Sequence, residues 1–222
     1  MSARDAMLVR IRRSLGVSGA DASRRAAVAD RLMRAPRGVV PARGQLPPEE
    51  RIALFIRMAR AASADVEHLA AGEVPGVIAR YLAERQFLPR LVMGADDRLA
   101  GVDWGGAALD VRSGNAMPSD SATVSHAEAG VAETGSLLLF SGPDNPTLLN
   151  FLPRVHVVLV REDAIVGDAE TALDRLRDMF GKGRLPRLVN FVTGPSRSGD
   201  IEQTMYLGAH GPGHLLVLVV KP

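Results

Sequence analysis

The pattern of apolar and polar positions divides the chain into a helical first part and a longer part in which strands and helices alternate. Apolar residues recur at helical spacing over residues 3–15 and 21–33. A third helix is predicted from Pro47 to about residue 62, because proline suits a first helical turn. The stretch 36–48 holds four Pro and two Gly, which predicts a linker without regular structure.

From residue 65 onward the pattern predicts short strands alternating with helices. The expected strands are 65–69, 90–94, 107–112, 122–126, 135–141, 155–161, 187–193 and 214–220. The expected helices are 74–85, 146–152 and 168–180, with a short one near 199–205.

Two of these strands indicate the architecture. Residues 155, 157–160 and 215–220 are apolar, which is typical of strands covered on both faces. We therefore expect an α/β fold in which a mostly parallel sheet has helices on both faces, preceded by an N-terminal helical extension. The predicted division is an Arg-rich helical extension and Pro/Gly linker over residues 1–46, and an α/β domain over 47–222.

Composition restricts the chemistry and the location. The chain has 222 residues and no cysteine, which excludes disulfides, thiolate nucleophiles and Cys-ligated zinc or iron–sulfur clusters. The N-terminus is Arg-rich with no apolar run behind it, and the longest apolar runs are about six residues. These features predict a cytoplasmic protein without a signal peptide or a membrane span.

Charge is unevenly distributed along the chain. Residues 1–60 contain 13 Arg and 5 acidic residues, whereas the remaining 162 contain 14 Lys or Arg and 20 acidic residues. The early Arg residues alternate with Ala, Leu and Val at helical spacing, and no aromatic residue lies among them for base stacking. We therefore expect a solvated helix face or an arm that docks an acidic surface, and no nucleic-acid binding.

The stretch from Asn190 to Pro212 is the first candidate for chemistry. An apolar strand ends at Gly194-Pro195, and polar residues follow, as in the ligand crevices at the carboxyl ends of strands in α/β sheets. The expected anion-binding residues are Ser196, Arg197, Ser198, Asp200 and Glu202, with Asp200 or Ser198 capping a helix. An ordinary strand-to-helix turn stays open as the alternative.

The second candidate is Glu133-Thr134-Gly135, directly before an apolar strand. Glu133 is a candidate nucleophile or general base, with the N–H groups of Thr134 and Gly135 placed to bind an oxyanion. The alternative is an idle acid in a solvated turn.

The five histidines give one further candidate. His210, in the turn before the last strand, is either a base or carboxylate binder or a structural residue. His156 is assigned to the core, and His126 is a weaker site candidate. No HxxxH or HxH spacing occurs, so no metal site is expected.

Four segments together carry a family resemblance. They are AETGSLLLFSG (132–142), LLNFLPRVHVVLVRED (148–163), TGPSRSGDIE (193–202) and GAHGP (208–212). Residues 65–220 resemble the LUD domain, and more narrowly the lactate-utilisation protein C (LutC/YkgG) family. The family motif usually reads SRTADIE, so Ser198 keeps the hydroxyl while Gly199 weakens a helix start.

The resemblance implies a fold similar to the NagB/RpiA/CoA-transferase type. It also implies a component of a cytoplasmic system that oxidises L-lactate to pyruvate together with iron–sulfur partner proteins, which would hold all the clusters because this chain has no cysteine. Whether the chain is itself a catalytic subunit of that oxidoreductase complex stays open. Its ligand would be a small carboxylate or phosphate.

Two alternatives remain at this point. One is a stand-alone enzyme acting on an acyl-CoA or sugar phosphate with Glu133 as nucleophile or base, by analogy with CoA transferases. The other is a non-catalytic scaffold subunit whose basic N-terminal third docks a partner.

Overall fold

The computed structural model describes residues 2–201 and 204–222 and divides into two units, Met1–Val39 and Val40–Pro222. The first unit holds helices α1 (Ala3–Ser14) and α2 (Ala22–Arg34), and no residue within these two ranges is buried. Ser2 and Asp21 begin the two helices by accepting backbone hydrogen bonds through their side chains. Local capping therefore defines these helices, and burial does not.

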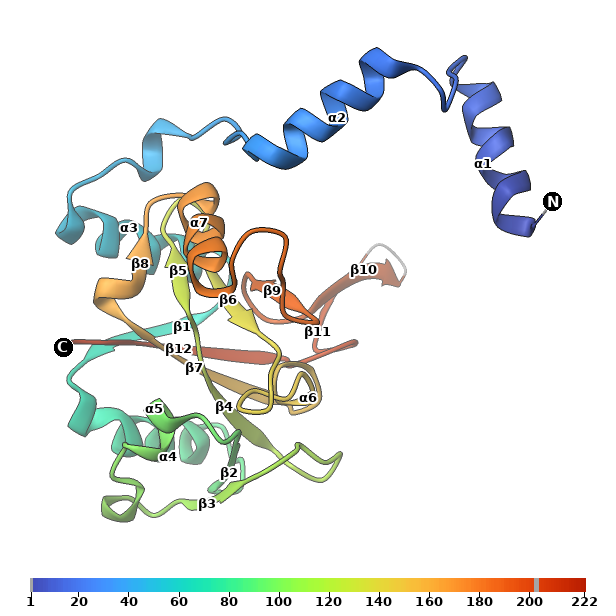
Figure 1. Ribbon diagram of the computed structural model, residues 1–222. Helices are drawn as coiled ribbons and strands as arrows, with labels where there is room; N and C mark the ends of the chain where they lie inside the picture. The colour runs from blue at the N-terminus through green and yellow to red at the C-terminus, as the bar shows by residue number, and fades with distance from the viewer. Residues whose placement is uncertain (1, 202–203) are drawn as a thin grey trace. The chain divides into compact units, whose positions relative to one another are not determined.

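The second unit is built on a six-stranded parallel sheet with strand order β1-β12-β7-β4-β2-β3 (Figure 1). Its strands are β1 (Asp65–Leu69), β2 (Arg90–Met93), β3 (Asp110–Ser113), β4 (Ala122–His126), β7 (Val155–Arg161) and β12 (His214–Val220). The helices are α3 (Pro48–Ala61), α4 (Val74–Glu84), α5 (Asp97–Ala100), α6 (Leu148–Phe151) and α7 (Ala169–Phe180).

The central strands β7 and β12 are buried on both faces. Val157 of β7 and Leu216 of β12 pack with Ile78 and other residues of α4. The alternate residues of the same strands, such as Val158, pack with α3 on the opposite face (Figure 1). Because side chains alternate across a strand, this double burial explains why the two strands are apolar at nearly every position.

A second, four-stranded sheet covers part of the face that α3 also covers. Its order is β8-β5-β6-β9, with β5 (Ala129–Val131), β6 (Ser136–Phe140), β8 (Ile165–Val166) and β9 (Val189–Val192). Leu137 and Leu139 of β6 face the α3 core, whereas Leu138 packs with Leu176 of α7 on the other side. The predicted α/β architecture, with a mostly parallel sheet between helices, is confirmed.

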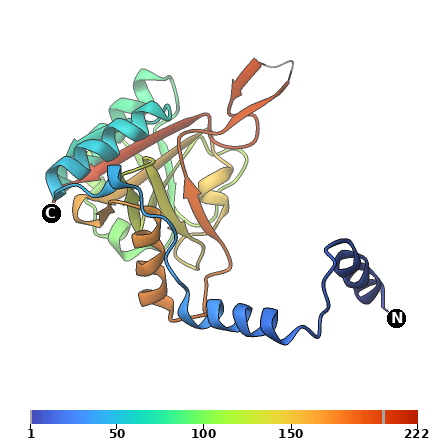
Figure 2. The ribbon, with the colours of Figure 1, turned by 90° about the horizontal axis from the view of Figure 1, so that it is seen from above.

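The predicted strand 135–141 is present as β6 and lies in the second sheet, where it pairs antiparallel with β5 and β9. One prediction about an element is wrong. The predicted helix near 199–205 is instead a hairpin of β10 (Arg197–Ile201) and β11 (Thr204–Leu207), which projects from the rest of the unit (Figures 1 and 2). Gly199 has poor helix propensity, and cross-strand pairing satisfies the backbone of Arg197 and Leu207 instead.

Within the described ranges 2–201 and 204–222, no helix has both the length and the apolar character that crossing a membrane requires.

Candidate functional site

The two loops that carry the predicted anion-binding residues lie against each other. The N–H of Ser196 donates to the carbonyl oxygen of Pro212 at 2.8 Å, and the N–H of Gly208 donates to the carbonyl oxygen of Ser196 at the same distance. The Arg197 guanidinium donates to the carbonyl oxygen of Ala62, where α3 ends. These bonds fix both loops relative to the core, although the N–H of Ser196 is thereby already engaged.

A cavity of about 430 Å³ lies beside these loops. Its polar lining residues include Asn150, His156, Thr193, Ser196, Arg197 and His210. The structure thus brings together three of the predicted site residues, Ser196, Arg197 and His210. A permanent guanidinium charge, an imidazole and neutral donors in one hollow suit a small anionic ligand.

The cavity lies at a different edge of the sheet from the one expected. His156 is the second residue of β7 and Leu215 the second of β12, so the cavity lies at the amino ends of these parallel strands. It also borders residues 189–193, which form β9 and the start of the loop after it. The loop 194–197 follows a strand of the second sheet, and for that reason it does not open at the carboxyl edge of the main sheet.

Two of the lining residues are buried polar side chains. Asn150 of α6 and His156 of β7 are both fully enclosed, and both hydrogen-bond to the hydroxyl of Ser125 in β4, at 3.0 and 3.1 Å. Burial lowers the pKa of His156 to about 3, so its ring is neutral at neutral pH. His156 therefore enters the site as a neutral hydrogen-bonding group and brings no charge.

Glu133 lies outside the residues that line this cavity. Its side chain is buried, and Oε1 accepts a hydrogen bond from the N–H of Ala169, the first residue of α7, at 3.0 Å. The N–H groups of Thr134 and Gly135 both donate to the carbonyl oxygen of Val131. The turn that was expected to bind an oxyanion therefore uses these donors within its own backbone.

The remaining predicted residues lie at varying distances from the cavity. Thr134 is connected to it by hydroxyl groups, since its Oγ1 lies 2.7 Å from Ser136 Oγ, which lies 2.6 Å from Oγ1 of the lining residue Thr193. Ser198 is in β10 and is not a lining residue. The side chain of Asp200 and all of Glu202 lie outside what the structure describes.

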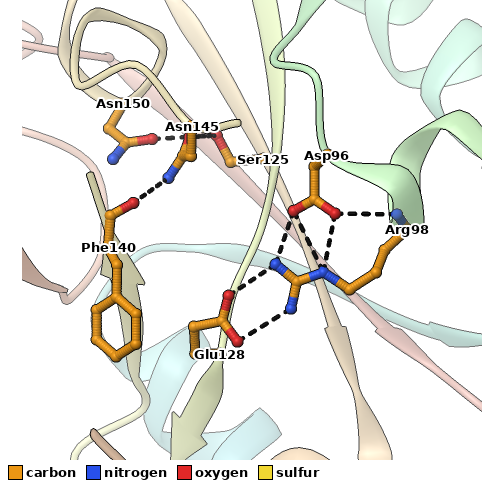
Figure 3. A network of polar contacts seen from close by, with 7 residues as sticks. All are labelled: Asp96, Arg98, Ser125, Glu128, Phe140, Asn145 and Asn150. Carbon is orange, nitrogen blue, oxygen red and sulfur yellow. Dashed lines mark hydrogen bonds and ion pairs between the residues drawn. The ribbon is translucent and has the colours of Figure 1, made fainter. Parts of the chain in front are cut away.

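A second cavity of about 550 Å³ lies at the carboxyl ends of β2 and β4. Arg98 in it hydrogen-bonds both Asp96 and Glu128 (Figure 3). Burial alone would raise the pKa of Asp96, but the Arg98 guanidinium outweighs burial and holds that pKa below its usual range. Arg98 is already paired with the carboxylates of Asp96 and Glu128. The second cavity is therefore the weaker anion site. Across the described residues, no three His, Asp or Glu side chains converge as a metal site would require.

Sequence reasoning missed Asn150, Ser125 and the site role of His156. One signal was present. Thr123 and Ser125 place two polar residues on the same face of an otherwise apolar strand, and Thr123 pairs in register with His156 on the next strand. Polar residues that recur at period two in a buried strand indicate a polar surface inside the protein.

Comparison with known proteins identifies a family model that matches most of the chain. The family model described as the LUD domain matches residues 52–220. Lactate utilization protein C from Shouchella clausii is 36% identical over 90 residues, which cover 40% of this chain and 39% of that protein. Lactate utilization protein C from Bacillus subtilis is 34% identical over 99 residues, covering 44% of this chain and 41% of that protein. The matched stretch thus spans about two fifths of the length of these relatives.

A solved structure shares the fold. The crystal structure of a DUF162 family protein from Deinococcus radiodurans superposes with a TM-score of 0.61 at 24% sequence identity, covering 79% of this chain and 99% of that chain.

Proposed function

Because this chain belongs to the LUD domain family, we propose that it is a component of a system that utilises L-lactate. The names of the relatives from Shouchella clausii and Bacillus subtilis support this role. Within that role, the chain binds a small carboxylate and acts beside partner proteins that oxidise lactate to pyruvate.

The observation that carries the proposal is the cavity between the loops 194–197 and 210–212. Arg197 and His210 both line it, and a guanidinium pairs well with a carboxylate because its fork of N–H groups matches the two oxygens. The volume of about 430 Å³ accommodates a three-carbon acid with space for a partner group or water.

The proposal gives the iron–sulfur chemistry to other chains. Oxidation of lactate to pyruvate removes two electrons and two protons, and this chain has no cysteine with which to ligate an iron–sulfur cluster. The proposal therefore places the clusters in partner proteins, which accept the electrons.

Growth on L-lactate as the sole carbon source tests the role of the cavity. A strain that lacks this protein is complemented with the wild type, with the double variant Arg197→Gln, His210→Gln, or with Arg80→Gln, which changes an exposed arginine of α4. We expect growth from the wild type and the control only. Wild-type growth from the double variant would refute a role for the cavity.

Affinity capture tests the partner part separately. The tagged full-length chain is recovered from cells grown on L-lactate, and the bound proteins are analysed for iron and acid-labile sulfide. Recovery without any iron–sulfur protein would exclude the proposed complex.

A further inference from the structure

Asn150 is one of the residues that line the first cavity, and its side chain has a buried N–H donor without a partner among the described residues. Its side chain is 2% exposed, and its Oδ1 accepts a hydrogen bond from the hydroxyl of Ser125 at 3.0 Å. Among residues 2–201 and 204–222, nothing accepts a hydrogen bond from its Nδ2, which points away from Ser125 (Figure 3). A buried amide N–H without an acceptor costs free energy, so such a group calls for an acceptor that the protein itself does not provide.

Ser125 and His156 determine which way the Asn150 amide faces. With the proton on Nε2, the neutral ring of His156 donates to Ser125 Oγ at 3.1 Å, which leaves the hydroxyl proton for Asn150 Oδ1. Because the amide oxygen of Asn150 accepts this bond, its NH₂ group lies on the side away from Ser125. The burial that keeps the pKa of His156 near 3 also keeps this arrangement independent of pH in the neutral range.

Asn145 completes the arrangement around Ser125. Its Oδ1 lies 3.3 Å from Ser125 Oγ, and its Nδ2 donates to the carbonyl oxygen of Phe140 at 2.9 Å, which fixes the orientation of this second amide (Figure 3). The serine has only one proton to donate, and the shorter bond to Asn150 is the better one. In the orientation that the structure shows, Asn150 Oδ1 is the nearer of the two acceptors to Ser125 Oγ.

We infer that Nδ2 of Asn150 binds the uncharged oxygen at C2 of a 2-hydroxy or 2-oxo carboxylate whose carboxylate is held by Arg197 and His210. Ser125 and His156 are positioning residues that act through Asn150. This inference rests on the proposed carboxylate ligand and deepens it, because it predicts which carboxylates the cavity selects.

Selectivity follows from the unpaired donor. A ligand with an oxygen at C2 supplies the acceptor that Nδ2 lacks, whereas propionate, which has the same carbon chain without that oxygen, leaves the donor buried and unpaired. One neutral hydrogen bond of this kind corresponds to a difference in affinity of about 10-fold.

Titration calorimetry with pyruvate, L-lactate and propionate tests the inference on the full-length chain. The wild type should bind the first two about 10-fold more tightly than propionate. Asn150→Leu should bind all three with the affinity of propionate. Arg197→Gln should weaken all three together, which separates loss of the carboxylate contact from loss of the C2 contact.

Two histidine variants test positioning. His156→Leu, like Ser125→Ala, should lose the preference for pyruvate over propionate. His156→Gln should recover it, because the glutamine amide places a donor near the position of Nε2. Equal loss in both histidine variants would show that His156 acts only by filling space.

The side-chain amide resonances of Asn150 in the ¹⁵N-labelled wild type give a measurement that needs no variant. Pyruvate should shift these resonances and propionate should leave them in place. If the wild type binds propionate as tightly as pyruvate, the inference fails, and the carboxylate ligand and the growth result stand. If no carboxylate binds at all, the inference and the ligand both fail, while lactate growth and iron–sulfur capture still decide the role.

Discussion

At the level of single residues, Gly135 lies where no side chain fits. Its φ is +69°, and a Cβ at this position would overlap the backbone of Met58 and Ala59 in α3. We expect Gly135→Ala to lower the free energy of unfolding by about 3 kcal/mol, because both the backbone conformation and the close contact must give way. Urea denaturation with an unchanged m-value would measure this loss.

Gly76 provides the matched control. It is exposed in the first turn of α4, and a Cβ at this position would have no neighbour within 4 Å among the residues that the structure describes. Gly76→Ala should raise stability by roughly 0.5–1 kcal/mol because alanine is the better helix former. If the two substitutions had equal effects, the close contact between Gly135 and α3 would not be a determinant of stability.

His156 predicts a pH dependence of stability. Its folded pKa of about 3 is below the ordinary value of 6.5, so the unfolded chain binds the extra proton between these two values. The stability that neutral His156 contributes is complete above pH 6.5 and is lost as pH falls towards 3, at up to about 1.4 kcal/mol per pH unit. Urea midpoints between pH 4 and 7 should change less steeply in His156→Gln than in the wild type. The control variant Arg80→Gln, at an exposed position of α4, should keep the wild-type slope.

At the level of elements, Glu133 stabilises the start of α7. Its carboxylate accepts from the Ala169 N–H beside Asp168, which caps the same helix through the N–H of Thr171. Glu133→Ala should cost about 1–2 kcal/mol of unfolding free energy, whereas Glu133→Gln keeps an acceptor oxygen and should cost less than about 0.5 kcal/mol. Thermal denaturation measures both, and loss of lactate growth in a stable Glu133→Gln variant would instead favour a catalytic Glu133.

Strong apolar patterns predicted whole elements to the residue. Strands 155–161 and 214–220 have the predicted bounds, because each contains a long apolar run. Strands 65–69 and 122–126 also have the predicted bounds, although polar residues interrupt both. The strands β5 and β8 were missed, since segments of three and two residues are too short to show a period. The second sheet was therefore also missed.

The sequence predicted Arg197 and His210 as site residues, but it did not predict the buried neutral residues beside them. Arg197 and His210 lie in turns rich in Gly and Pro, and polar residues in such turns are readily recognised as a site. Asn150, Ser125 and His156 come from three different elements, and only the side-by-side pairing of β4 with β7 brings them together. Strand order in a parallel sheet depends on crossovers that single-sequence patterns do not specify.

At the level of the whole molecule, the two units differ in charge and in burial. Residues 1–39 contain nine Arg and three Asp, a balance of +6, and the rest of the chain balances at −4 to give the total of +2. No residue of α1 or α2, which span 3–14 and 22–34, is buried, although Met7 and Leu32 are large and apolar. Basic helices with exposed apolar residues are suited to docking on an acidic partner surface.

Removal of residues 1–39 should therefore separate ligand binding from partner binding. Every described residue that lines the cavity lies between 150 and 215, so the chain 40–222 should bind pyruvate with the affinity of the full-length protein. Its melting temperature should stay within about 2 °C of the full-length value, because α1 and α2 contain no buried residue.

Capture of iron–sulfur proteins from lactate-grown cells by the shortened chain should fall at least about 10-fold, since the docking charge is removed. Undiminished capture by the shortened chain would assign partner binding to the α/β unit, and weaker pyruvate binding would show that the helices contribute to the site.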